Sequence, residues 1–112
     1  MGTQTYCGTR RYQRITLPKG MFIAWYGGGV QRVSRVRTLG MGGLFVAEPN
    51  APAVGSRLRL SFDVPGGNVH VEATVRNVTP GVGMGLEFVK LNTRDRVLME
   101  ILLRRLLRQI PE

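Results

Sequence analysis

The chain has 112 residues, with 16 lysines and arginines against seven acidic residues, and a formal net charge of +9. A chain of this length is expected to form one domain with its own core, so folding needs neither a disulfide nor a metal ion. Cys7 is the single cysteine and no apolar run approaches the ~20 residues that span a bilayer, so we expect a cytoplasmic protein without membrane insertion.

The positive charge is concentrated in the first part of the chain. Residues 1–47 contain seven basic residues and no acidic one, whereas residues 48–92 contain four of each and residues 93–112 contain five basic and three acidic residues. A segment without carboxylates cannot neutralise its own arginines, so it presents a positive field to an anion. A surface whose charge serves only solubility is the alternative.

The first 20 residues are polar and basic, show no periodicity, and close with Pro18 and Gly20. We therefore expect a flexible basic arm over residues 1–20. The folded domain is expected over residues 21–112.

Short β-strands separated by glycine-rich turns are predicted in the first part of that domain. The segments "RLRLSFDV" (57–64) and "VHVEATVRNV" (69–78) alternate between apolar and polar residues, which is typical of half-buried strands. In "VQRVSRVRTL" (30–39) the apolar residues fall at every third position, which predicts a strand with a bulge. The other predicted strands are 21–26, 43–47 and 84–91. Six short strands with tight turns indicate a small antiparallel barrel or sandwich.

The end of the chain changes to a helical period. Asn92 is a predicted N-cap, Asp95 lies in the first turn, and Pro111 ends a helix of about residues 93–109. The apolar residues of its predicted inner face are Val97, Leu98, Ile101, Leu102, Leu106 and Ile110. We expect this helix to pack on the barrel or cover one of its ends.

Two glycine clusters, "GMGG" (40–43) and "GVGMG" (81–85), resemble phosphate-binding loops only superficially. Each leads into a predicted strand, whereas a dinucleotide or P-loop turn must open a helix. Neither is followed by the lysine and hydroxyl residue of a Walker motif. The expected role of "GVGMG" is a turn and the entry into a strand.

Candidate catalytic and metal-binding residues are few. His70 is the single histidine, lies on the predicted outer face of a strand, and has only Cys7 as a further soft ligand. A metal site needs three or four convergent ligands, and no serine lies in a nucleophile elbow. We therefore expect a protein that is not an enzyme and that has no metal ion or cofactor.

The motif "RRYQR" (10–14) is the clearest binding signal. Arg10 and Arg14 are separated by three residues and could converge on one ligand. Guanidinium groups suit phosphate oxygens and the O6/N7 edge of guanine, and they stack on bases. Taken alone, two such arginines are more often simply solvated.

With this arm, the chain resembles the PilZ domain family, bacterial receptors for cyclic di-GMP. In that family an Arg-xxx-Arg arm precedes an [Asp/Asn]-x-Ser-x-x-Gly stretch, a strand, further hairpins and a terminal helix. "RRYQR" resembles the arm, "TLGMGGLFV" aligns with the second motif without gaps, and "GVGMGLEFVKL" resembles the final strand, so the resemblance covers about residues 9–108. It implies a mainly β fold, a six-stranded antiparallel β-barrel of the split-barrel type with a C-terminal α-helix.

The second motif departs from the family pattern at two positions. Thr38 stands where the family has Asp or Asn, and Gly40 stands where it has Ser, whereas Gly43 agrees. In the family the first side chain pairs with a guanine edge and the serine supports the ligand. Loss of two such contacts at ~1–2 kcal/mol each would weaken binding roughly 30- to 1000-fold. The ligand-binding residues that the resemblance implies are Arg10, Arg11, Arg14, Thr38, Gly40 and Gly43.

The resemblance implies a cyclic di-GMP receptor or adaptor that orders its arginine arm on the ligand and signals to an unidentified protein effector, as a monomer or a ligand-dependent dimer. The main alternative is a degenerate PilZ domain that binds no nucleotide and serves as a protein-interaction module.

Two further alternatives are weaker. A barrel that binds single-stranded nucleic acid needs exposed aromatic rings among its charges, and the candidates are Tyr12, Trp25 and Tyr26. Membrane binding by "ILLRRLLRQI" is disfavoured because the core needs these leucines.

Overall fold

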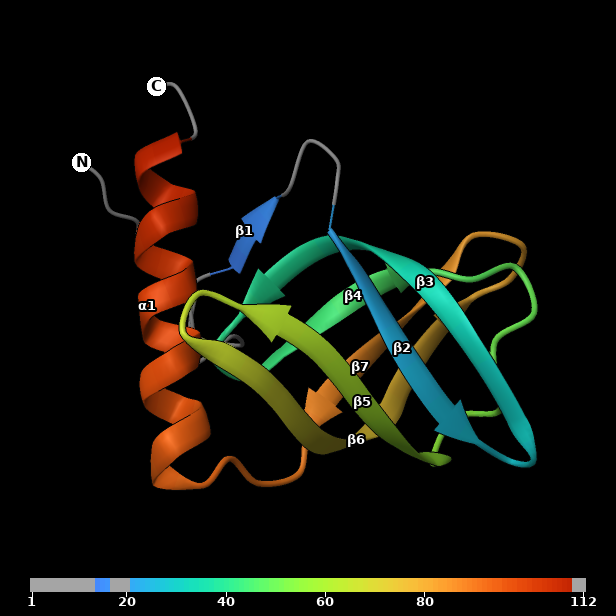
Figure 1. Cartoon of the computed structure of the whole chain (residues 1–112). Helices are drawn as coiled ribbons and strands as arrows, with labels where there is room; N and C mark the ends of the chain where they lie inside the picture. Colours follow the sequence, from blue (N-terminus) through green and yellow to red (C-terminus); the bar gives the residue numbers. More distant parts are fainter. Residues whose placement is uncertain (1–13, 17–20, 110–112) are drawn as a thin grey trace.

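The computed structural model describes residues 14–16 and 21–109, and the side chains of 21–107 (Figure 1). The expected arm, residues 1–20, lies outside this part of the chain apart from one short strand. The elements are β1 (Arg14–Thr16), β2 (Phe22–Gly27), β3 (Val30–Gly40), β4 (Gly43–Ala47), β5 (Arg57–Val64), β6 (Gly67–Thr79), β7 (Gly83–Phe88) and α1 (Thr93–Gln109).

Six strands form a closed antiparallel barrel in the order β3-β2-β5-β6-β7-β4, and the pairing of β4 with β3 closes it. β1 pairs with the last residues of β3, beyond the segment that pairs with β2. Because β4 occupies the opposite edge of β3 there, β1 continues the sheet on the same edge as β2. The predicted six-stranded barrel with a C-terminal helix is confirmed.

The core consists of the inward-facing residues of each strand. Successive residues of a strand point to opposite faces, so the alternating segments of β5 and β6 each bury one set of apolar side chains. These sets are the predicted ones: Leu58, Leu60, Phe62 and Val64, and Val69, Val71, Ala73 and Val75. Trp25 lies among them and is 1% exposed.

The predicted bulge in β3 is confirmed. The register with β4 shifts between Val36 and Thr38, so that Arg37 is the additional residue. A bulge adds one residue to one strand and changes which positions face inward beyond it. In a regular strand, residues three positions apart point to opposite faces. Because of the bulge, Val36 and Leu39 are both buried, whereas Val33, before the bulge, is exposed.

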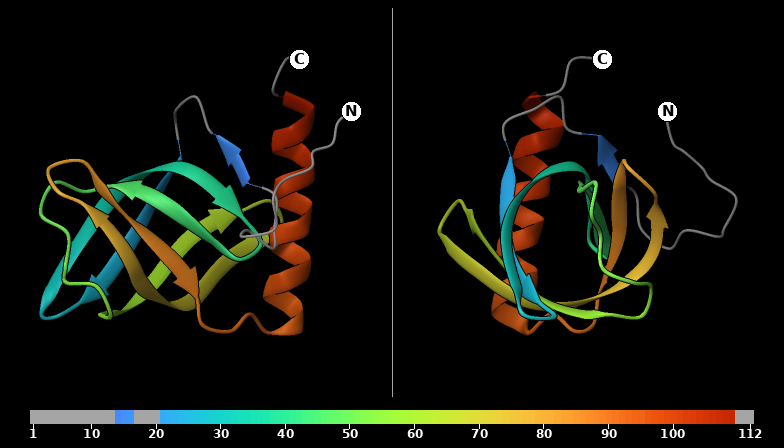
Figure 2. Two further views of the ribbon diagram at one scale, coloured as in Figure 1. Left: turned by 180° about the vertical axis from the view of Figure 1, so that it is seen from behind. Right: turned by 90° about the vertical axis from the view of Figure 1, so that its right-hand side faces the viewer.

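Helix α1 covers one end of the barrel, beside the turn between β5 and β6 (Figures 1 and 2). Its predicted N-cap is confirmed, because the backbone N–H of Asp95 donates to Oδ1 of Asn92 at 2.7 Å. The buried Asp95 carboxylate also accepts a hydrogen bond from Arg94 at 2.9 Å. The first turn of the helix is thus held by the side chains of Asn92 and Arg94.

The predicted inner face of α1 is only partly correct. Leu102 is buried, but Val97 and Ile101 are 49% and 37% exposed, and Ile110 lies outside the described residues. The apolar residues span a wide arc of the helix, and the barrel covers only the arc centred on Met99, which is fully buried. The final strand is also shorter than predicted, since β7 ends at Phe88.

Candidate functional site

The register between β1 and β3 brings the two sequence motifs together. Arg14 pairs with Gly40, Ile15 with Leu39, and Thr16 with Thr38. Directly opposed residues of antiparallel strands have Cα atoms only about 4.5–5.5 Å apart. The last residue of the arginine motif therefore lies beside the first half of the glycine motif, although a whole hairpin separates them in sequence.

Two of the predicted arginines, Arg10 and Arg11, lie outside the described residues. Arg14 is placed through its backbone, as the first residue of β1. Of the predicted ligand residues, the structure thus places Arg14, Thr38 and Gly40 side by side in one ladder.

The second motif forms the end of β3, the connection to β4, and the first residue of β4. Leu39 is completely buried in the core, so the half-buried Thr38 next to it points to the outside of the barrel. Gly40 is buried beside β1, and positive φ angles occur at other glycines only. The φ angle of Gly40 therefore does not require a glycine.

Gly43 has a different reason to be glycine. A Cβ at this position would overlap the carbonyl oxygen of Leu86 and lie 3.1 Å from the Cα of Glu87, both on β7. Next to it, the carbonyl oxygen of Gly42 accepts a hydrogen bond from Phe88 at 2.9 Å. Close approach of β4 and β7 therefore accounts for Gly43 without any ligand.

The charge around the motif is positive. Arg37, the bulged residue directly before Thr38, is exposed and forms no ion pair with any described residue. Farther along β3, Nη1 of Arg32 lies 3.9 Å from a carboxylate oxygen of Glu48. The end of β3 that adjoins β1 thus retains a free cation for an anionic ligand.

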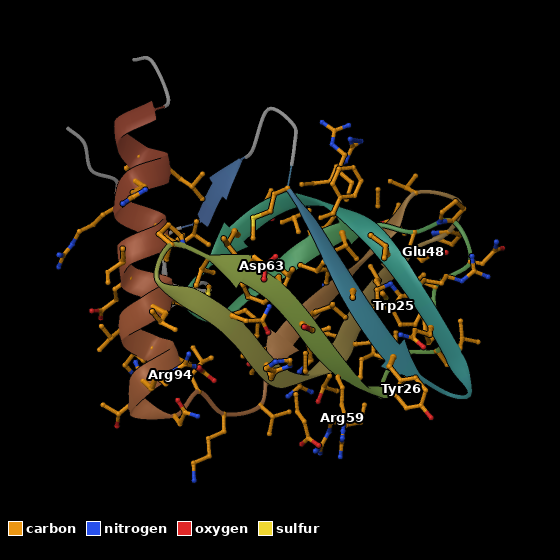
Figure 3. All side chains as sticks on the ribbon, viewed as in Figure 1. Trp25, Tyr26, Glu48, Arg59, Asp63 and Arg94 are labelled. Carbon is orange, nitrogen blue, oxygen red and sulfur yellow. The ribbon has the colours of Figure 1, made fainter. Side chains whose placement is uncertain are left out.

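A buried polar chain that sequence reasoning missed joins β2, β3 and the residue after β4. Nε1 of Trp25 donates to Oγ of Ser34 at 2.8 Å, and this hydroxyl donates to Oε1 of Glu48 at 3.1 Å. The other carboxylate oxygen of Glu48 accepts from the backbone N–H of Asn50 at 3.1 Å. Figure 3 shows Trp25 and Glu48 within the barrel. A serine at an inward position of a strand was the available signal.

Two other expectations can be compared with the structure. Trp25, one of the candidate aromatic platforms, is buried and cannot stack on a base. His70 is exposed, as predicted from its outward position on β6.

Within residues 14–16 and 21–109, no group of His, Cys, Asp and Glu side chains could hold a metal ion.

The model of the PilZ domain family matches residues 8–109, nearly the whole chain. The chain belongs to the PilZ domain family. The comparison with curated proteins gives no significant match. In the described part of this PilZ chain, no helix is long and apolar enough to cross a membrane.

Several solved structures share the fold of this chain at low identity. The PilZ domain of YcgR from Escherichia coli, solved with c-di-GMP, has a TM-score of 0.67 at 18% identity, over 90% of this chain and 93% of that one. PlzA of Borreliella burgdorferi, solved in complex with c-di-GMP, has a TM-score of 0.67 at 16% identity, over 83% of this chain and 40% of that one. The Bacillus subtilis inhibitor of motility MotI/DgrA has a TM-score of 0.73 at 20% identity, over 94% and 55%. This PilZ chain therefore spans about half the length of MotI/DgrA and less of PlzA.

Proposed function

We propose that this PilZ chain is a receptor for cyclic di-GMP that orders its arginine arm on the ligand and signals to a protein partner. The register that sets Arg14 opposite Gly40 and Thr16 opposite Thr38 carries this proposal. This register brings the arginine motif and the glycine motif together at the outer surface of the barrel, where one ligand could contact both.

In this proposal the residues have distinct roles. Arg10 and Arg14 clamp phosphate oxygens and a guanine edge, which the planar guanidinium fork suits, and Arg11 adds positive charge. Thr38, Gly40 and Gly43 form the floor, where Thr38 offers a hydroxyl and the buried Gly40 contributes backbone alone. Binding orders the arm and changes the surface beside it.

The family and its solved members support the ligand. Two of the structural neighbours were solved with c-di-GMP, but at 16–18% identity they share the fold with this chain, and the ligand is inferred from the motifs. The proposed role is binding and signalling without catalysis. A cytoplasmic location is part of the proposal, because the single cysteine suits a reducing compartment.

A degenerate PilZ domain that binds no nucleotide is the second candidate. The altered positions Thr38 and Gly40 favour it, and Gly43 has a reason in packing alone. In that case the arginine arm and the barrel form a protein-interaction module.

Calorimetric titration with cyclic di-GMP, GTP and a short oligonucleotide separates these candidates. Heat with cyclic di-GMP alone supports the receptor, and silence with all three supports the interaction module. Hydrogen exchange at the amides of residues 8–14 tests the ordering step, because the receptor predicts protection that rises when cyclic di-GMP is added.

A further inference from the structure

The outer face of β2 and β3 carries three large exposed apolar side chains. Phe22 is 56% exposed, Tyr26 is 53% exposed and Val33 is 68% exposed. We call these residues together with Ala24 the β2–β3 face. A single exposed apolar residue needs no explanation, but a contiguous group on one sheet face marks an interaction surface.

The strand registers show that these residues are neighbours. Phe22, Ala24 and Tyr26 alternate along β2, and Val33 of β3 lies directly opposite Ala24. On the other side of β2, Ser61 of β5 lies opposite Ala24. With a rise of about 3.3 Å per residue, the Cα atoms of Phe22 and Tyr26 are ~13 Å apart, and the short side chains of Ala24 and Ser61 lie between the two rings.

No other described element covers this surface. Helix α1 lies at one end of the barrel, and the hairpin between β2 and β3 lies at the opposite end (Figures 1 and 2). Figure 3 shows Tyr26 and Arg59 on the outside, on neighbouring strands. Among the residues that the structure places, none therefore covers the face between Phe22 and Tyr26.

The edge of the face is positively charged. Arg37 lies directly before Thr38 in β3, and Arg59 of β5 lies directly opposite Tyr26. Neither arginine forms an ion pair with a described residue. The nearby carboxylates are engaged. Asp63 accepts a hydrogen bond from Asn68 at 2.6 Å, and Glu72 pairs with Arg57 at 3.3 Å.

The positive charge beside the β2–β3 face indicates which kind of partner binds it. A second copy of this chain would bring a further net charge of +9 against the same basic edge, which is unfavourable. Nucleic acid suits the arginines and the two rings, but Val33, the most exposed of the group, offers no surface for stacking. A protein segment with apolar and acidic side chains matches both the apolar group and the two unpaired arginines.

We propose that the β2–β3 face is the docking surface for an acidic protein segment whose two apolar side chains pack against Phe22 and Tyr26 and whose carboxylates meet Arg37 and Arg59. This inference rests on the protein partner of the proposed function, to which it gives a surface and a chemistry, and it does not depend on nucleotide binding. Because Arg37 adjoins Thr38, the docked segment would lie next to the proposed ligand site.

The experiment is a titration of the full chain, followed by the shifts of its backbone amide resonances. The probe is a short synthetic glutamate-rich peptide with phenylalanines spaced as Phe22 and Tyr26 are. The matched controls are the same peptide with lysine for every glutamate, and a short oligothymidylate. The test variant is Phe22→Thr with Val33→Thr, which places a β-branched residue suited to strands at both positions. Val54→Thr, in the loop after β4, is the control variant because Val54 is also exposed.

The acidic peptide should shift amides of β2 and β3 in a saturable way, with affinity that falls at high salt. The double variant should bind the acidic peptide at least about tenfold more weakly, whereas Val54→Thr should bind it with normal affinity. The proposal is overturned if the acidic peptide gives no shifts, if the lysine peptide binds equally, or if the double variant binds normally. Shifts on this face with oligothymidylate alone, or on concentrating the protein alone, would assign it instead to nucleic acid or to a second copy.

Cyclic di-GMP titrated into the same double variant keeps this inference separate from the proposed receptor. Normal nucleotide binding with loss of the peptide supports the docking surface. Peptide binding by a protein that does not bind cyclic di-GMP removes the receptor and leaves the docking surface in place.

Discussion

Arg14 lies directly opposite Gly40 in the antiparallel ladder between β1 and β3. This pairing places the last arginine of the Arg-xxx-Arg motif beside Gly40, which stands where the family pattern has serine. A ligand held by the arm would therefore contact the altered part of the floor. The pairing also makes the consequence of that alteration measurable, because the two motifs can be changed independently.

Restoration of the family side chains should strengthen binding. In the double variant Thr38→Asp with Gly40→Ser, the introduced carboxylate can accept from N1–H and the amino group of guanine, and nearby arginines favour its ionised form. Gly40 has no positive φ, so serine there requires no left-handed backbone conformation. We expect the affinity for cyclic di-GMP, measured by calorimetry, to rise about tenfold or more.

Thr79→Asp adds the same charge at an exposed position of β6 and serves as the control. If the double variant folds and still binds no cyclic di-GMP, the floor is lost beyond these two residues and the interaction-module candidate is favoured. A gain equal to that of the control would show that the effect is only one of net charge.

Removal of the clamp should abolish most of the binding. Arg14→Ala removes charge-assisted hydrogen bonds to the ligand, so we expect affinity to fall by ~2 kcal/mol or more, about 30-fold. The melting temperature should change little, since β1 is short and packs at the edge of the barrel. Arg96→Ala, on the exposed side of α1, is the matched control. Unchanged affinity in Arg14→Ala would remove Arg14 from the ligand site.

Substitution of Gly43 should destabilise the fold. The Cβ of Gly43→Ala would overlap the carbonyl of Leu86, so β4 and β7 must separate, at a cost of about 3 kcal/mol. Gly28→Ala places its Cβ in open space at a φ of 60°, where the strain is only ~1 kcal/mol. Urea unfolding should therefore give a clearly lower midpoint for Gly43→Ala. Equal midpoints, with loss of cyclic di-GMP binding in Gly43→Ala alone, would show that the ligand and not β7 requires this glycine.

The buried polar chain should depend on Ser34. Ser34→Ala leaves Nε1 of Trp25 without an acceptor and removes the donor to Oε1 of Glu48, which should destabilise the fold by about 1–3 kcal/mol. The half-buried Ser61, which makes only a long 3.4 Å contact with Asn68, gives a matched control in Ser61→Ala. Urea unfolding followed by Trp25 fluorescence measures both. Equal stability of the two variants would show that the chain contributes nothing.

The strands β5 and β6 could be predicted because they obey a period of two, whereas the choice of a six-stranded barrel over a sandwich came from the resemblance to the PilZ family. In β5 and β6 each apolar residue could be assigned to the core from the alternation alone, since a shift by one residue would expose the whole set. The bulge at Arg37 was also predictable, because the spacing from Val36 to Leu39 departs from that period. Both are local properties of a strand.

Features that depend on packing between distant segments could not be predicted. The packing reason for glycine at position 43 could not be predicted, because the close approach of β7 to Gly43 depends on the closure of the barrel. The helix pattern did not distinguish the buried Met99 from the exposed Val97, because the arc that the barrel covers is set by tertiary contacts. At the candidate site, the motifs were visible, and their juxtaposition through β1 was not.

Titration of the labelled full chain with cyclic di-GMP, followed by its backbone amide resonances, tests the receptor most directly. A receptor should show saturable shifts in two separate segments at once, Arg14–Thr16 and Thr38–Gly43, with few changes at the far end of β6 near Thr79. GTP at the same concentration should not reproduce them. No shifts in either segment, or shifts located only elsewhere on the barrel, would contradict the claim that this chain binds cyclic di-GMP between its arginine arm and the end of β3.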